Sequence, residues 1–135
     1  MNRRLLAIDL GDRRTGVAIG DEGTGTAMPL EVLHIPKGEA LQEALLKLIK
    51  AHAPDAIIVG LPLNMDDSEG PRATDARAFG SALACCCDCT IHMHDERLTT
   101  FEADDRMRGT SRREKKSRSD AVAACVLLES FLAAQ

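Results

Sequence analysis

Three acidic residues occupy positions from which their carboxylates could act together. Asp9 follows four apolar residues, Glu96 follows a short strand-like segment, and Asp120 begins an apolar stretch. Side chains at strand ends and helix starts can converge on one cleft. Converging carboxylates repel one another unless a hard cation neutralises them, and magnesium prefers oxygen ligands. The pattern therefore predicts a Mg²⁺ or Mn²⁺ site; a helix cap, a turn former or a solvated charge is the alternative for each residue taken singly.

Such a site suits the hydrolysis of phosphodiester bonds. Two metal ions about 3.5–4 Å apart can activate a water molecule and stabilise the leaving oxygen. In a helix, residues three, four and seven positions apart share a face. Asp120 is therefore expected to share the apolar face that carries Ala124 and Leu127. One hypothesis that these positions allow is a divalent-metal-dependent nuclease in which Asp9, Glu96 and Asp120 are both the catalytic residues and the metal ligands.

A basic segment accompanies the acidic residues. Residues 106–118 contain seven basic residues and one acidic residue, although the whole chain has a net charge of −4. An acidic body with a basic segment is typical of a metal site beside a phosphate-binding arm. A solvated surface loop is equally compatible with this charge pattern. The residues expected to bind nucleic acid here are Arg112, Arg113, Lys115 and Lys116.

The elements that must position these residues follow from the periodicity of the apolar residues. Strands are expected over residues 5–8, 16–20, 27–35, 56–59 and 90–95. Helices are expected over residues 39–52, 71–84 and 99–107 and from a cap at Ser117 or Ser119 onward, after a loop at residues 109–116. A hairpin followed by alternating strands and helices predicts an α/β domain with a mixed sheet flanked by helices. We expect one domain over residues 1–135.

The composition disfavours several other classes of protein. The chain has three Phe and no Tyr or Trp, so it lacks the aromatic platforms on which many single-strand binders stack bases. No run of 18 apolar residues predicts a membrane-spanning helix. The first apolar run is too short for a signal peptide. A cytoplasmic protein without a membrane partner is expected.

The cysteines are clustered. Four of the five lie within residues 85–89, and in a reducing cytosol we expect free thiols. Cys86 and Cys89, followed by His92 and His94, also have a spacing compatible with zinc. The additional cysteines make that spacing ambiguous, and small apolar packing residues at a helix end are the simpler interpretation.

Four sequence blocks resemble the YqgF-type family of pre-16S rRNA nucleases, whose members are also described as Holliday-junction-resolvase-like. The blocks are AIDLGDRRTGVA at residues 7–18, VGLPLNM with SEGPRA at residues 59–73, DERLTT at residues 95–100 and SDAVAA at residues 119–124. They occur in the family's order and span nearly the whole chain. The sequence departs from the family at Asp67, where Gly is common, and in its cysteine run.

The resemblance implies a ribonuclease H-like fold with a five-stranded mixed sheet, in which the first three strands are antiparallel and the later ones parallel. It implies a divalent metal, and it places the family's acidic residues on Asp9, Glu96 and Asp120. The implied role is to process the 5′ end of the 16S rRNA precursor. Structured RNA and precursor ribosomal particles are the expected partners.

The remaining motif residues have two interpretations each. Gly11, Gly16 and Gly60 are expected to form tight turns beside the site, and Gly60 is also a candidate for the wall of a cleft. Arg14 and Arg97 are expected either to contact substrate phosphates or to pair with a motif acid.

Two further functions stay open. One is a Holliday-junction resolvase acting on branched DNA, which would require a two-fold dimer because it cuts two strands symmetrically. The other is a non-catalytic RNA-binding factor in ribosome assembly. The complete set of three carboxylates favours the nuclease, and the sequence is compatible with a monomer or a weak homodimer.

Overall fold

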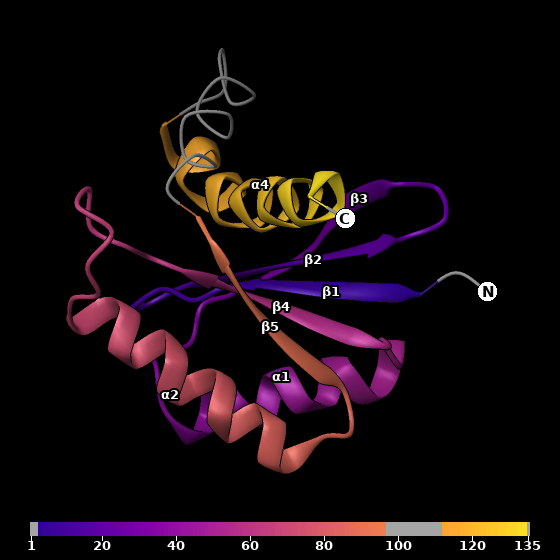
Figure 1. Cartoon of the computed structure of the whole chain (residues 1–135), viewed down its shortest axis with the longest axis horizontal. Coiled ribbons are helices and arrows are strands. Elements are labelled where there is room, and N and C mark those ends of the chain that lie inside the picture. The colour runs from indigo at the N-terminus through magenta and orange to yellow at the C-terminus, as the bar shows by residue number, and fades with distance from the viewer. Residues whose placement is uncertain (1–2, 97–111, 135) are drawn as a thin grey trace.

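A five-stranded mixed sheet lies between two layers of helix (Figure 1). The computed structural model describes residues 3–96 and 112–134, and the side chains of residues 112–120 lie outside that description. The strands are β1 (Arg4–Asp9), β2 (Thr15–Asp21), β3 (Thr26–Leu33), β4 (Ala56–Leu61) and β5 (Thr90–Asp95). The helices are α1 (Glu39–His52), α2 (Pro71–Cys86) and α4 (Arg112–Ala133). None of the helices in the described part of the chain is long and apolar enough to cross a membrane.

The strand order is β3-β2-β1-β4-β5. β1 pairs antiparallel with β2, and β2 antiparallel with β3, whereas β4 runs parallel to both β1 and β5. The predicted mixed sheet is confirmed, with β1 and β4 at its centre. Both central strands read as short apolar runs because both of their faces are buried.

Alternate residues of these strands face different helices. Leu6, Ile8, Ile57 and Val59 pack with residues of α1 and α2. Leu5, Ala7, Ala56 and Ile58 pack instead with α4, through Ala124, Leu127, Leu128 and Phe131. Figure 1 shows α4 on one side of the sheet and α1 and α2 on the other. Odd-numbered residues of β1 and even-numbered residues of β4 therefore point towards α4.

The ends of α1 follow the sequence expectation. Ala53 adopts a left-handed conformation with φ 46°, and its N–H donates to the carbonyl oxygen of Ile49 at 2.8 Å. Pro54 then prevents the helix from continuing. The helix expected over residues 71–84 is also present and extends to Cys86.

The start of α4 was predicted wrongly. Residues 112–116 were expected to belong to a loop, but the helix begins at Arg112. Ser117 and Ser119 consequently lie inside the helix and do not cap it. The helix expected over residues 99–107 lies outside the described residues.

Candidate active site

The side chains of Asp9 and Glu96 come together on the α4 face of the sheet. Asp9 is the last residue of β1 and lies on the same face as Leu5 and Ala7, which pack against α4. Glu96 directly follows β5, and its backbone N–H donates to the carbonyl oxygen of Leu61 at 3.3 Å. This bond continues the pairing of β5 with β4 by one residue. Two of the three predicted carboxylates thus lie at the carboxyl end of the sheet.

Gly60 provides the space in which they meet. β4 separates β1 from β5, and adjacent strands lie about 4.8 Å apart, so β1 and β5 are about 10 Å apart. Gly60 follows Val59, which pairs with Ile8, and Gly60 itself pairs with His94. A Cβ atom built on Gly60 would overlap the Glu96 carboxylate and would lie 3.3 Å from Leu127 Cδ2. The missing side chain lets Glu96 reach across the middle strand.

A second glycine flanks Asp9 on its other side. Gly16 pairs with Asp9 in the antiparallel register of β1 and β2. Gly16 and Gly60 therefore lie within strands and do not form turns, contrary to the sequence prediction. Both leave the carboxylate of Asp9 without a bulky neighbour on the adjacent strands.

The two carboxyl groups interact directly. Burial raises the pKa of Glu96, and a side-chain hydrogen bond with Asp9 acts against that shift, followed by the positive charge of Arg72. A hydrogen bond between two carboxyl groups requires a proton on one of them. The two carboxyl groups are therefore close enough to share one proton when no metal is bound. An all-oxygen donor set of this kind fits a hard divalent cation.

Asp120 lies in α4, four residues before Ala124 and seven before Leu127. These helical positions share one face, and Leu127 is the residue of α4 that lies beside Gly60. The side chain of Asp120 lies outside the described residues, as does that of Arg97. No group of three or more His, Cys, Asp or Glu residues arranged to hold a metal exists among the residues whose side chains are described. The three-carboxylate metal site therefore stays a prediction.

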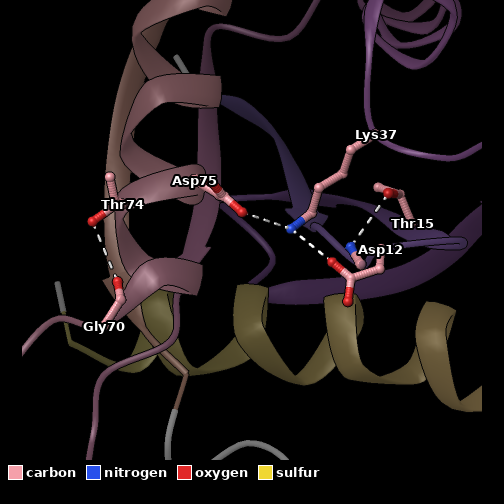
Figure 2. Close-up of polar contacts among 7 residues, drawn as sticks. Asp12, Thr15, Lys37, Gly70, Thr74 and Asp75 are labelled. Carbon is pink, nitrogen blue, oxygen red and sulfur yellow. Dashed lines mark hydrogen bonds and ion pairs between the residues drawn. The ribbon is translucent and has the colours of Figure 1, made fainter.

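The turn between β1 and β2 is closely packed. The N–H of Gly11 donates to Thr15 Oγ1 at 3.4 Å, and the Thr15 side chain is fully buried (Figure 2). A Cβ atom on Gly11 would overlap the carbonyl oxygen of Arg14. Gly11 therefore does form the tight turn that the sequence predicted, and the turn holds Arg14 half-buried beside it.

Lys37 joins this turn to α2, and the sequence reasoning missed it. Its Nζ lies 2.9 Å from Asp12 Oδ1 and 3.4 Å from Asp75 Oδ2 (Figure 2). The hydrogen bond and charge of Lys37 hold the pKa of Asp12 below its usual value. A lone lysine after a proline carries no sequence signal for this role.

The basic residues have a different setting from the predicted one. Arg112, Arg113, Lys115 and Lys116 lie in the first two turns of α4, on the same helix as Asp120. A helix fixes the spacing of these residues relative to Asp120, which a loop would not. Their side chains lie outside the described residues, so their predicted contacts with phosphate stay predictions.

The possible zinc ligands do not form a metal site. His92 and His94 pack against Phe131 of α4, with ring centroids 5.1 and 5.7 Å from it. Cys89 Sγ donates to the carbonyl oxygen of Pro54 at 3.2 Å. These residues make no metal-binding group within the described part of the chain. The histidines belong to the packing between β5 and α4, and the five cysteines are free thiols.

The loop after β4 explains one departure from the family pattern. Asp67 has φ 71°, in the left-handed region that favours glycine. Its N–H donates to the carbonyl oxygen of Asn64 at 2.9 Å, and the N–H of Asn64 donates to the carbonyl oxygen of Ser68 at 2.9 Å. A glycine would adopt this backbone conformation without strain, whereas Asp67 adopts it within a hydrogen-bonded turn.

Comparison with known proteins shows the family. A family model described as "RuvX: Holliday junction resolvase" matches residues 3–134. The chain belongs to the RuvX family. A RuvX relative from Anaeromyxobacter sp. (strain Fw109-5), named "Putative pre-16S rRNA nuclease", is 43% identical over 131 residues, covering 96% of each chain. A relative of the same name from Salmonella paratyphi B is 41% identical over 133 residues, covering 97% of this chain and 96% of its own.

Solved structures show the same fold at low identity. The T. thermophilus RuvC in complex with a Holliday junction substrate aligns with TM-score 0.61 and 13% identity, over 98% of this chain and 94% of that one. The Fowlpox virus resolvase in complex with Holliday junction DNA aligns with TM-score 0.64 and 10% identity, over 97% of each chain. These similarities confirm the ribonuclease H-like architecture of a resolvase-like nuclease family. At such identities they concern the fold alone.

Proposed function

We propose that this RuvX chain is a divalent-metal-dependent nuclease acting on the 5′ side of the 16S rRNA precursor in the cytoplasm. The observation that carries the proposal is the hydrogen-bonded pair of Asp9 and Glu96 above Gly60. Two half-buried carboxyl groups in contact destabilise a fold when both are ionised. A bound cation would neutralise the two carboxylates and remove this repulsion.

In this proposal Asp9, Glu96 and Asp120 hold the metal. The bound Mg²⁺ or Mn²⁺ supplies an activated water and stabilisation of the leaving oxygen. The protein's part is to orient the carboxylates, and three contacts do this for Asp9 and Glu96. The pairing of β1 with β2 fixes Asp9, the bond from Glu96 N–H to Leu61 fixes Glu96, and Gly60 leaves room between them.

The relatives' names favour an RNA substrate, and the family's description favours branched DNA. We propose RNA because relatives above 40% identity over nearly the whole chain carry the rRNA nuclease name, whereas the DNA-bound structures share 13% identity or less. A resolvase also needs a two-fold assembly to cut two strands symmetrically.

The decisive experiment is cleavage of a pre-16S rRNA fragment beside a synthetic four-way DNA junction, each with Mg²⁺, Mn²⁺ or EDTA. The variants are Asp9→Asn, Glu96→Gln and Asp120→Asn, with Glu43→Gln, an exposed residue of α1, as the control. Metal-dependent cleavage of the RNA that is lost in the three variants and kept in the control supports the proposal. Cleavage of the junction alone would replace it with the resolvase. RNA binding without cleavage would indicate an assembly factor.

A further inference from the structure

A cation beside the carboxyl pair has no partner of its own among the described residues. Arg72 is the second residue of α2 and is exposed, whereas the next residue, Ala73, is fully buried. Ala73 packs in one cluster with Leu61, which directly follows Gly60. The first turn of α2 is therefore fixed against the end of β4, next to the site.

A second contact holds the same turn in place. Asp75, one helical turn after Arg72, pairs with Lys37, which also pairs with Asp12 (Figure 2). The first turn of α2 is thereby tied to the loop between β1 and β2. The first turn of α2, which carries Arg72, is therefore held both at the end of β4 and at this loop.

The charge of Arg72 acts on both sides of this position. It lowers the pKa of Glu96 and also that of Asp12, in each case after stronger influences. The guanidinium group thus lies within electrostatic range of the carboxyl pair and of the β1–β2 loop. This agrees with the position that packing gives to its backbone.

Arg72 differs from Lys37 and Arg77, two basic residues of this region that pair with acids. Lys37 pairs with two aspartates, and Arg77 makes two hydrogen bonds with Glu69, at 2.6 and 2.8 Å. Arg72 makes no hydrogen bond or ion pair with another described residue. Its five donors are therefore not used within the described fold. A guanidinium group presents these donors in a planar fork that matches two phosphate oxygens.

We propose that Arg72 binds a backbone phosphate of the nucleic acid next to the phosphodiester group held at the Asp9–Glu96 pair. The inference rests on the proposed nuclease function and adds a substrate-binding residue to it. An acidic metal site by itself repels the phosphates on either side of the bond to be cut. A fixed cation at the rim, close to the carboxylates yet not paired with them, offsets this repulsion and sets the path of the strand.

The test separates phosphate binding from a general electrostatic effect. Binding of the labelled pre-16S fragment and of the four-way junction is measured from 50 to 300 mM salt, with Ca²⁺ replacing Mg²⁺. The proteins are wild type, Arg72→Ala, Arg72→Lys and Lys47→Ala, an exposed lysine of α1. Thermal melting checks that each variant is folded.

We expect Arg72→Ala to weaken binding about tenfold and to reduce the salt slope by about 0.7–0.9, the contribution of one phosphate contact. Arg72→Lys should restore the slope, and Lys47→Ala should leave both quantities unchanged. A residue that only adjusts the pKa of Glu96 would change the pH dependence of cleavage and leave the salt slope intact.

Each other outcome is informative. Equal slopes for wild type and Arg72→Ala would overturn the inference and leave the nuclease proposal standing. An equal loss in Arg72→Ala and Lys47→Ala would also overturn it, because the effect would then be one of net charge. A specific loss in Arg72→Ala without cleavage by the wild type under any metal would keep Arg72 as a phosphate-binding residue and reject the nuclease. If wild type binds neither nucleic acid, both proposals fail.

Discussion

Asp9 and Glu96 share a hydrogen bond across a strand that separates them in the sheet. The bond exists because the intervening residue, Gly60, has no side chain, and because the residue beside Asp9 on the opposite strand is also a glycine. The two glycines, Gly60 and Gly16, are therefore as necessary to the geometry of the site as the two acids.

Gly60→Ala is expected to lower cleavage by about 100-fold, because the new methyl group displaces the Glu96 carboxylate and a shift of about 1 Å at a reacting centre has an effect of that size. Overpacking should cost about 1–3 kcal/mol of stability. The measurements are kcat/KM and a urea titration. Gly80→Ala, in α2 on the other face of the sheet, is the control because its new methyl group meets the flexible Met93 Sδ at 3.1 Å and Ile91 at an ordinary 3.6 Å. Equal losses of activity in both variants would contradict this account.

Glu96→Gln is expected to stabilise the metal-free protein at neutral pH. Burial raises the pKa of Glu96 in the folded state, so ionising it weakens the fold. The contribution of Glu96 to stability should be fully present below the ordinary carboxyl value of 4.5 and should be lost as the pH rises through the raised pKa. The variant should lack that loss. Urea unfolding in EDTA from pH 4 to 8 measures it, with Glu43→Gln as the control; a less stable Glu96→Gln at pH 8 would refute it.

His94 should give the opposite pH dependence. Burial lowers its pKa below 6.5, with Asp95 acting against the shift. Its stabilising effect is then present above pH 6.5 and is lost as the pH falls through the lowered pKa. His94→Gln should flatten this part of the stability curve. The quantity to follow is the difference in the free energy of unfolding between variant and wild type at each pH, because Glu96 also contributes to the pH dependence of stability. His34→Gln, at an exposed residue, should leave the curve unchanged.

Lys37→Met removes the link between the β1–β2 loop and α2. Because Asp12 and Asp75 are exposed, at 79% and 58% of their side-chain area, water screens both ion pairs and the loss of stability should be small. Cleavage should be affected more strongly than stability, because the loop next to Asp9 is no longer tied to α2. A double-mutant cycle with Asp75→Asn should be non-additive. Additive effects would show that the two side chains are not coupled in solution.

Replacing Arg112, Arg113, Lys115 and Lys116 by Gln should weaken nucleic-acid binding and flatten its dependence on salt. The slope should fall by about 0.7–0.9 for each phosphate that the variant no longer binds. These residues lie on α4, so circular dichroism should accompany the binding measurement to confirm that the helix persists. If a folded variant keeps the wild-type salt dependence of binding, this part of α4 does not bind nucleic acid.

Sequence patterns predicted the strands well, because β1 and β4 are short apolar runs buried on both faces. They also predicted that Asp9 and Glu96 belong together, since each stands at the carboxyl end of a predicted strand. They failed for Gly60, because a glycine near the end of a strand usually indicates a turn. The role of Gly60 depends on the register of three strands and on how far the Glu96 side chain extends. The residues next to Gly60 in the sequence indicate neither.

The start of α4 was missed for a different reason. Residues 112–116 contain no apolar residue, so the periodicity on which the prediction relied gives no signal there. Arg, Glu and Lys are nevertheless good helix formers, and intrinsic propensity would have extended the helix. Lys37 and Arg72 could not have been found in this way, because their significance lies in which acids surround them in space.

The packing of α4 has a consequence for the order of events during synthesis. Leu5, Ala7, Ala18 and Ile58 are covered on one face by residues of this helix, which follows all five strands in the chain. A protein is made from its N-terminus, so the sheet face bearing Asp9 and Gly60 stays bare on the ribosome until α4 has been translated. A nascent chain therefore lacks Asp120 and the cover over the carboxyl pair. Under the proposed function, the three carboxylates can come together only after α4 has been translated.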